Sequence, residues 1–243
     1  MNHNRNVTDA ADAVTLPLER LAKLIEEASE GDGCQTDARR ATEPPVSLVR
    51  EANGWGKKYV FPITLTGDRW LAMFAQAKAE IAAHGIVAFL GDRGPGKTQM
   101  AAEIARDGEW PDDAVYLIRH GDASYKQTSK TALYRRAMDV FLDLRATNKK
   151  DATTSEKDVL RRLEEVGLLV IDEFQERGQS DWEDRIITNL IDKRYAAERP
   201  TILIANYTRE EMSAALSPSV RDRMHEAGRS FVFDWSSYRR SRP

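Results

Sequence analysis

The sequence has one cysteine, Cys34, among its 243 residues. A single cysteine excludes an internal disulfide and a cysteine-based zinc site, and it favours a free thiol in a reducing compartment. No apolar run approaches the roughly 20 residues that a helix needs to span a bilayer. The first residues, MNHNRNVTDAAD, lack the apolar centre of a signal peptide. We therefore expect a cytoplasmic protein with no membrane partner.

The sequence also has little net charge. A formal charge of -3 does not by itself indicate a nucleic-acid-binding protein, so any such role depends on a local patch. Hydrophobic residues make up 41% of the chain and charged residues 31%, which is ordinary for a folded globular protein. The length suits one sizeable α/β domain with a small additional element.

A glycine-rich turn lies between an apolar run, residues 86–90, and an alanine-rich helical pattern. The turn, GDRGPGKT, matches G-x-x-x-x-G-K-[ST] at every fixed position. Glycines allow backbone N–H groups to close around phosphate oxygens, and the following helix adds its positive N-terminus. We expect Lys97 to reach the β- and γ-phosphates of ATP and Thr98 to bind Mg²⁺. The expected nucleotide-binding residues are Gly91, Gly94, Gly96, Lys97, Thr98 and Gln99.

Two further apolar runs end in polar residues. Residues 168–173 read LLVIDE, and residues 201–206 read TILIAN. The carboxyl ends of parallel strands share one edge of a sheet, so Asp172 is expected beside the glycine-rich turn as a second Mg²⁺ ligand. Glu173 is the candidate general base for the attacking water, and Asn206 is expected to contact that water or the γ-phosphate.

Strands and helices alternate after the glycine-rich turn, which predicts a parallel sheet with crossover helices. Residues 114–120, AVYLIRH, are predicted as the second strand of that sheet. Helices are predicted from Gly67-Asp68 to Gly85, over 99–106 and over 182–194. Thr153 and Glu156 match a capping box for the helix that precedes Gly167.

Residues 119–150 are basic although the chain is acidic overall. They contain eight basic and three acidic residues, interleaved with aromatic rings. Such a mixture suits single-stranded DNA, because cations contact phosphates and rings stack on bases. The candidate DNA contacts are Tyr125, Lys126, Lys130, Arg135 and Arg136. The alternative is an ordinary amphipathic helix with the core stripe Leu133, Ala137, Val140 and Leu144.

We expect three regions along the chain. Residues 1–45 form an acidic extension with one short amphipathic helix over 16–31, residues 46–68 a linker, and residues 69–243 the main domain. The helix either packs on its own domain or docks into a groove of a partner protein. Near the other end, Arg221 and Arg223 in SPSVRDRM are either surface residues or arginines supplied to a neighbour's γ-phosphate.

From about Arg69 to Arg240 the order of motifs resembles an AAA+ ATPase of the DnaC/IstB group. The resemblance is carried by GDRGPGKT, LLVIDEFQERGQSDWEDRIITNLIDKRY, ERPTILIAN, SPSVRDRM and FVFDWSSYRR. It implies a P-loop NTPase (AAA+) α/β core with a parallel sheet and flanking helices, a minimal or absent helical lid, and a small N-terminal helical extension. It also implies roles: Walker A and B for Lys97, Thr98, Asp172 and Glu173, sensor 1 for Asn206, arginine finger for Arg223 or else Arg221, and sensor 2 for Arg239.

The implied function is an ATPase that uses ATP and Mg²⁺, self-associates in the ATP state, and loads a hexameric replicative DNA helicase onto single-stranded DNA. Three alternatives remain open at this stage. One is an IstB-like transposition helper that coats duplex DNA and recruits a transposase. The others are a small-molecule P-loop kinase and a non-hydrolysing adaptor that uses ATP only to hold its shape. The kinase lacks an evident acceptor site, and the intact Asp172-Glu173 pair argues against the adaptor.

Overall fold

The structure is a computed structural model of the 243-residue chain. It describes residues 53–59, 67–83, 85–108, 110, 116–120, 123–127, 132–149, 152, 154–178 and 180–237. For residues 116–120, 123–127 and 227, only the backbone is described. The predicted extension over 1–45 and most of the predicted linker lie outside these residues, so the amphipathic helix over 16–31 stays a prediction.

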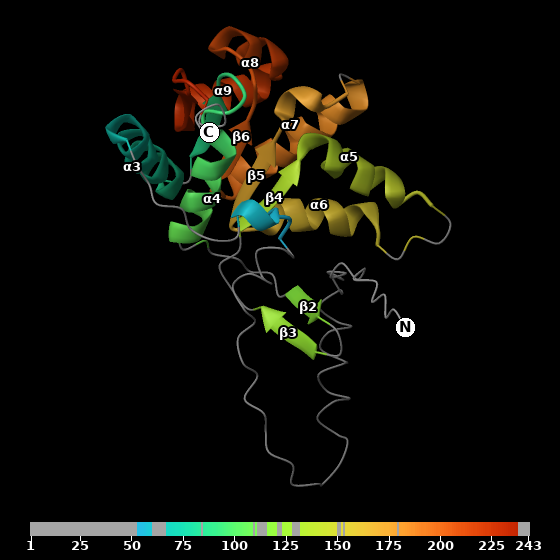
Figure 1. The fold of residues 1–243 in the computed structure, drawn as a ribbon. Coiled ribbons are helices and arrows are strands. Elements are labelled where there is room, and N and C mark those ends of the chain that lie inside the picture. The colour runs from blue at the N-terminus through green and yellow to red at the C-terminus, as the bar shows by residue number, and fades with distance from the viewer. Residues whose placement is uncertain are drawn as a thin grey trace, which may run out of the picture.

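A parallel sheet of five strands lies at the centre of the described chain, in the order β4-β5-β6-β1-β7 (Figure 1). Its strands are β1 (Ile86–Leu90), β4 (Ala132–Arg136), β5 (Leu168–Asp172), β6 (Thr201–Ile204) and β7 (Gly228–Val232). Every residue of β1, β5 and β6 is buried, as expected for inner strands of a sheet covered on both faces. The carboxyl ends of these three neighbouring strands meet at one edge, where the predicted polar residues lie.

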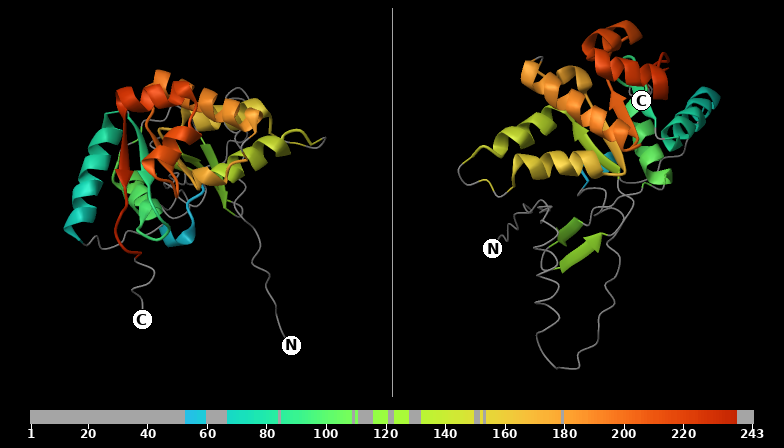
Figure 2. Two further views of the ribbon diagram at one scale, coloured as in Figure 1. Left: turned by 90° about the horizontal axis from the view of Figure 1, so that it is seen from above. Right: turned by 180° about the vertical axis from the view of Figure 1, so that it is seen from behind.

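Helices cover both faces of the sheet (Figure 2). One face carries α3 (Asp68–Ala82) and α4 (Lys97–Asp107), which pack against Val87 and Phe89 of β1. The other face packs against Ile86, Ala88 and Leu90. It carries α5 (Ala137–Ala146), α6 (Glu156–Glu165), α7 (Asp181–Ala196), α8 (Arg209–Ala215) and α9 (Pro218–Ala227). The α/β parallel-sheet architecture is therefore as predicted.

The predicted position of residues 114–120 in the parallel sheet is wrong. Within them β2 (Tyr116–His120) pairs in antiparallel register with β3 (Ala123–Gln127), and the two form a separate two-stranded sheet. The place beside β5 is taken by β4, whose residues 132–136 were expected only within a helical stripe. Residues 132–136 have a helical pattern locally, so long-range pairing with β5 rather than local preference places them in the sheet. The predicted core stripe is buried, but Leu133 lies on the strand and the helix begins at Ala137.

The N-terminus of α6 differs from its prediction by two residues. Ser155 is the N-cap, and it forms a capping box with Asp158 instead of the predicted pair of Thr153 and Glu156. The backbone N–H of Asp158 donates to Ser155 Oγ at 3.2 Å, which satisfies one of the helix's free N–H groups. Thr153 itself lies outside the described residues.

A buried arginine joins α6, α7 and the start of β6. Arg194 of α7 is fully buried, and its guanidinium donates to carbonyl oxygens of Leu163 (2.8 Å), Val166 (2.8 Å) and Pro200 (2.6 Å). It also donates to the Thr201 hydroxyl at 2.9 Å. A planar guanidinium suits this site, because its five N–H donors satisfy carbonyls that would otherwise be buried without partners.

Replacing Arg194 by methionine is expected to lower the free energy of unfolding by about 3 kcal/mol, because several buried carbonyl groups lose their donor. The measurement is urea unfolding followed by circular dichroism. Arg185→Met is the matched control, since Arg185 lies on the same helix and is exposed. Equal stability of the two variants would show that Arg194 does not hold these elements together.

Candidate functional site

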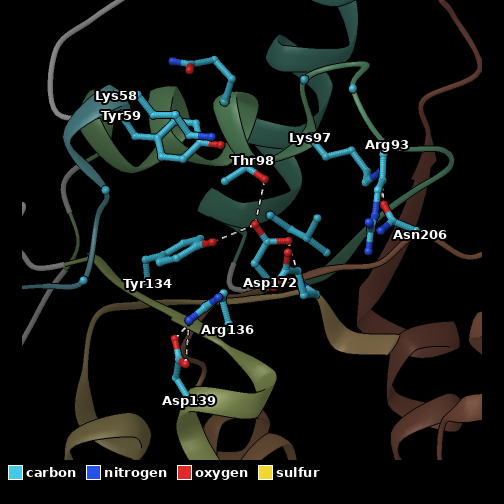
Figure 3. A pocket seen from close by; sticks show the side chains of 17 residues that line it. Lys58, Tyr59, Arg93, Lys97, Thr98, Tyr134, Arg136, Asp139, Asp172 and Asn206 are labelled. Carbon is cyan, nitrogen blue, oxygen red and sulfur yellow. Dashed lines mark hydrogen bonds and ion pairs between the residues drawn. The ribbon is translucent and has the colours of Figure 1, made fainter. Parts of the chain in front are cut away.

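The polar ends of β1, β5 and β6 surround a cavity of about 980 Å³ (Figure 3). The loop after β1 supplies one wall, and Asp172 and Asn206 lie at the ends of the other two strands. Residues of the segment 53–59 and the end of β4 complete the lining. The predicted Walker and sensor 1 positions, which lie up to 109 residues apart in sequence, therefore share one cavity.

Three glycines of the loop from Gly91 to Gly96 have backbone conformations that other residues seldom adopt. Gly91, Gly94 and Gly96 have φ values of 114°, 107° and 99°. A Cβ on Gly91 would also lie 2.6 Å from the carbonyl oxygen of Phe233, too close for any side chain. Gly96 is the N-cap of α4, so the free N–H groups at the start of that helix border the cavity. Such a helix start favours anions.

Lys97 is 6% exposed and holds the two sides of the cavity together. Its Nζ donates to the carbonyl oxygens of Gly91 and Asp92, both at 2.6 Å, and to Oδ1 of Asn206 at 2.9 Å. The backbone N–H of Asn206 donates to Oε1 of Gln175 at 3.0 Å, which fixes the end of β6. The ammonium group is thus positioned among oxygen acceptors that a phosphate oxygen can replace.

Thr98 and Asp172 form the second polar contact across the cavity. The Thr98 hydroxyl donates to Oδ2 of Asp172 at 2.7 Å, which leaves the hydroxyl oxygen's lone pairs available to a cation. Asp172 is 6% exposed, and its Oδ1 accepts from the backbone N–H of Glu173 at 2.7 Å. A hydroxyl beside a fixed carboxylate is a donor set that suits Mg²⁺, which prefers oxygen ligands.

Tyr134 also contacts this carboxylate, a contact that the sequence analysis missed. Its hydroxyl donates to Oδ2 of Asp172 at 2.9 Å. Burial, and then the adjacent Asp172 charge, raise the pKa of Tyr134 well above its usual value, so the phenol keeps its proton. The sequence suggested an aromatic ring for DNA stacking, whereas the structure turns this ring toward the cavity. The signal for this contact is the position of Tyr134 on a strand beside β5, and the sequence did not predict that strand.

Glu173 lines the cavity with an unusual backbone. Its φ of 52° and ψ of 42° lie in the left-handed region, which non-glycine residues seldom occupy. Burial, and then the charges of Glu176 and Asp172, raise the pKa of its carboxyl group. Strained backbone of this kind is common in catalytic sites. Glu173 is thus directed at the cavity by the turn that ends β5.

The predicted arginines of α9 are not among the residues that line this cavity. Arg223 Nε lies 3.2 Å from Oδ1 of Asp192, and its Nη1 donates to Ser219 Oγ at 2.6 Å. Arg221 donates from Nη2 to the carbonyl oxygen of Leu216 at 3.5 Å. Both arginines lie on the face of the sheet opposite α4. The structure therefore keeps them apart from the predicted Walker residues of the same chain.

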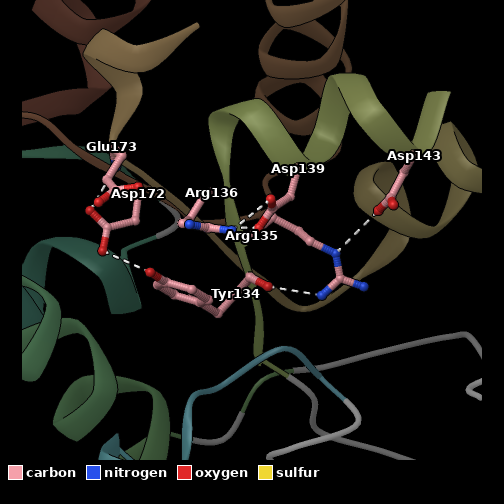
Figure 4. Close-up of polar contacts among 7 residues, drawn as sticks. All are labelled: Tyr134, Arg135, Arg136, Asp139, Asp143, Asp172 and Glu173. Carbon is pink, nitrogen blue, oxygen red and sulfur yellow. Dashed lines mark hydrogen bonds and ion pairs between the residues drawn. The ribbon is translucent and has the colours of Figure 1, made fainter. Parts of the chain in front are cut away.

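Two of the predicted DNA contacts have described side chains, and both are paired (Figure 4). Arg135 is largely buried. Its Nη1 donates to the carbonyl oxygen of Tyr134 at 2.9 Å, and its Nε lies 3.7 Å from Oδ2 of Asp143. Arg136 is exposed, lines the cavity and binds both carboxylate oxygens of Asp139, at 2.9 and 3.0 Å. For Tyr125 and Lys126 only the backbone is described, on β3, and Lys130 and Arg239 lie outside the described residues.

A short segment ahead of the main domain also lines the cavity. It contains the helical turn η1 (Lys57–Tyr59), and Gly54, Gly56, Lys58 and Tyr59 face the cavity. Arg106 of α4 donates to the carbonyl oxygen of Tyr59 at 3.0 Å, which holds the turn in place. These residues lie within the predicted linker over 46–68. The glycines that flank Trp55 are the local signal for a close backbone approach.

No family model matches the chain. Among curated proteins, the replicative helicase loader DnaC of Escherichia coli K12 is 33% identical over 152 residues, which are 62% of this chain and 55% of that protein. The chain thus spans about half the length of that relative. YdaV of Escherichia coli K12, an uncharacterized protein, is 30% identical over 241 residues, which are 95% of this chain and 90% of YdaV. The chain belongs to the same family as YdaV. It is related over part of its length to the replicative helicase loader DnaC, and it has the fold of an AAA+ P-loop NTPase.

Several solved structures have a fold similar to that of this chain. The crystal structure of the DnaC helicase loader gives a TM-score of 0.52 at 18% identity, covering 73% of this chain and 99% of that one. The crystal structure of DnaI gives 0.52 at 16% identity, covering 75% and 93%. The replication initiator DnaA, bound to AMPPCP and single-stranded DNA, gives 0.52 at 15% identity, covering 74% and 51%. Within the described residues, every helix is too short or too polar to span a bilayer.

Proposed function

We propose that this DnaC-related protein binds ATP with Mg²⁺ and loads a hexameric replicative DNA helicase onto single-stranded DNA, with ATP hydrolysis as the switch. The proposal rests on two hydrogen bonds in one cavity, from Lys97 to Asn206 and from Thr98 to Asp172. The chain that contains them is related to a replicative helicase loader. An AAA+ core of this kind couples nucleotide state to conformation through contacts to the γ-phosphate.

The residues of the cavity suit ATP and Mg²⁺. Lys97 would exchange the carbonyl oxygens of Gly91 and Asp92 for β- and γ-phosphate oxygens, as a P-loop lysine does. Gly94, Gly96 and Gln99, which also line the cavity, would take further phosphate oxygens at the start of α4. Thr98 and Asp172 would hold Mg²⁺, which when bound neutralises charge on the phosphate oxygens.

For hydrolysis, Glu173 would accept the proton of the attacking water and Asn206 would orient that water. Arg223, which lies apart from its own cavity, would contact the γ-phosphate bound by a neighbouring copy, with Arg221 as the second candidate. We propose that Arg239 is a further contact to the nucleotide. These roles require a homo-oligomer in the ATP state, with each site completed across a subunit interface.

Single-stranded DNA is proposed to bind along residues 119–150, which carry eight basic and three acidic residues. Because Arg135 is largely buried whereas Arg136 is exposed, Arg136, Lys126 and Lys130 are the cations of first choice, with Tyr125 for base stacking. The helicase is proposed to bind the extension over 1–45 through its amphipathic helix.

A loading assay tests this function. Closed circular single-stranded DNA with one annealed oligonucleotide gives a ring-shaped helicase no free end to thread onto. With the host's helicase, the full chain and ATP, we expect the oligonucleotide to be displaced. Equal displacement without the chain would contradict the proposal, and filaments on duplex DNA with no displacement would favour the transposition helper.

Replacing Lys97 by alanine is expected to weaken ATP binding by about two to three orders of magnitude, because two charge-assisted hydrogen bonds to phosphate are lost. Isothermal titration calorimetry with ATP and Mg²⁺ measures the affinity. Lys78→Ala is the matched control, since Lys78 is half-buried on α3, pairs with Asp107 and does not line the cavity. Unaltered ATP affinity in the folded Lys97→Ala variant would refute the assignment of the cavity.

A further inference from the structure

Asp172 is held by three hydrogen-bond donors from three elements. Oδ2 accepts from the Thr98 hydroxyl of α4 at 2.7 Å and from the Tyr134 hydroxyl of β4 at 2.9 Å. Oδ1 accepts from the backbone N–H of Glu173 at 2.7 Å. Without the phenol, the carboxylate would keep only the Thr98 hydroxyl and the backbone N–H of the next residue in the chain. Tyr134 is therefore the contact that ties this carboxylate to β4.

Tyr134 is itself held in place by the segment that precedes the main domain. Its backbone N–H donates to the carbonyl oxygen of Asn53 at 2.9 Å. Its ring lies 5.0 Å from the ring of Trp55, and Trp55 Nε1 donates to the carbonyl oxygen of Ala132, two residues earlier on the same strand, at 2.9 Å. Gly54 has a φ of 86°, and a Cβ there would lie 2.3 Å from the carbonyl oxygen of Tyr134. Residues 53–55 thus form a brace along β4.

We infer that Tyr134 is a positioning residue for the Mg²⁺ site: its phenol holds Asp172 in the orientation that serves the metal, and the brace of residues 53–55 holds the phenol. The inference rests on the proposed ATP–Mg²⁺ function. Partners of metal ligands fix ligand orientation, and their loss commonly costs 10- to 100-fold in metal affinity. Through Tyr134, the same contacts connect the segment of residues 53–55 to Asp172, the proposed metal ligand.

Tyr134→Phe tests the inference, because it removes one hydroxyl and keeps the ring against Trp55. The probe is a fluorescent N-methylanthraniloyl derivative of ADP, titrated with Mg²⁺ and, separately, bound in the presence of EDTA. We expect the half-saturating Mg²⁺ concentration to rise at least about 10-fold, with the affinity in EDTA changed less than about 2-fold. This readout involves no hydrolysis, so it separates the metal site from catalysis.

Tyr195→Phe is the matched control, since Tyr195 is a partly buried tyrosine of α7 that does not line the cavity, and its Mg²⁺ dependence should equal that of the wild type. Trp55→Phe, which loses the donor to Ala132, should raise the Mg²⁺ requirement in the same direction by a smaller factor, and it carries the test if Tyr134→Phe does not fold. An unchanged Mg²⁺ requirement in both folded variants overturns the inference alone. Nucleotide binding by the wild type that is absent or independent of Mg²⁺ overturns the proposed function itself.

Discussion

Replacing Arg223 by alanine is expected to lower the ATP hydrolysis rate of the self-associated protein by about 10³- to 10⁵-fold, the usual contribution of an arginine supplied to a γ-phosphate. The side chain is suited to this task because it lies on α9, apart from its own cavity, and is 28% exposed. Asp192 and Ser219 hold the guanidinium on the surface of its own subunit, so it must leave these partners to reach a neighbour.

Mixing two inactive variants tests whether Arg223 acts in trans. Arg223→Ala subunits keep Glu173, and Glu173→Gln subunits keep Arg223, so a mixed oligomer contains some interfaces with both residues. Hydrolysis should therefore return on mixing, whereas each variant alone stays inactive. Arg229→Ala, an exposed arginine on β7 that pairs with Glu80, should hydrolyse ATP at the wild-type rate. Full activity of Arg223→Ala alone would refute the role and turn attention to Arg221.

Replacing Glu173 by glutamine is expected to slow hydrolysis by about 10²- to 10⁴-fold and to leave ATP affinity nearly unchanged. The amide has the shape of the carboxylate but cannot accept the proton of the attacking water. The left-handed backbone of Glu173 is set by the turn after β5, so the substitution should preserve the geometry of the site.

Single-turnover hydrolysis and equilibrium binding, measured on the same Glu173→Gln preparation, separate the two effects. Glu80→Gln is a suitable control, because Glu80 lies on α3 and pairs with Arg229. Hydrolysis at the wild-type rate in Glu173→Gln would remove this residue from its role. A parallel loss of binding would instead mean that the turn after β5 had been disturbed.

Contiguous motifs made most of the site predictable from sequence. The loop from Gly91 to Thr98, the pair Asp172-Glu173 and the tip residue Asn206 each follow a short apolar run, and the parallel sheet brings such ends together. The edge strand β4 was missed because its five residues run directly into α5, whose helical periodicity extends back over Leu133.

Contacts between distant segments were beyond prediction from one sequence. The Asn53–Tyr134 and Trp55–Ala132 hydrogen bonds join residues about 80 positions apart, and no local pattern specifies that pairing. The N-cap of α6 was also not predictable from one sequence. Two overlapping patterns, one at Thr153 and one at Ser155, satisfy the capping rule, and the sequence alone does not choose between them; the helix uses Ser155.

Native mass spectrometry of the full chain with its host's replicative helicase, in ATP and in ADP, tests the central claim most directly. The helicase-loader account predicts a complex that depends on the nucleotide and contains several copies of this chain per helicase hexamer. Truncation of residues 1–45 should then abolish the complex if the extension is the docking element. No complex in either nucleotide, together with filaments on duplex DNA, would contradict the account.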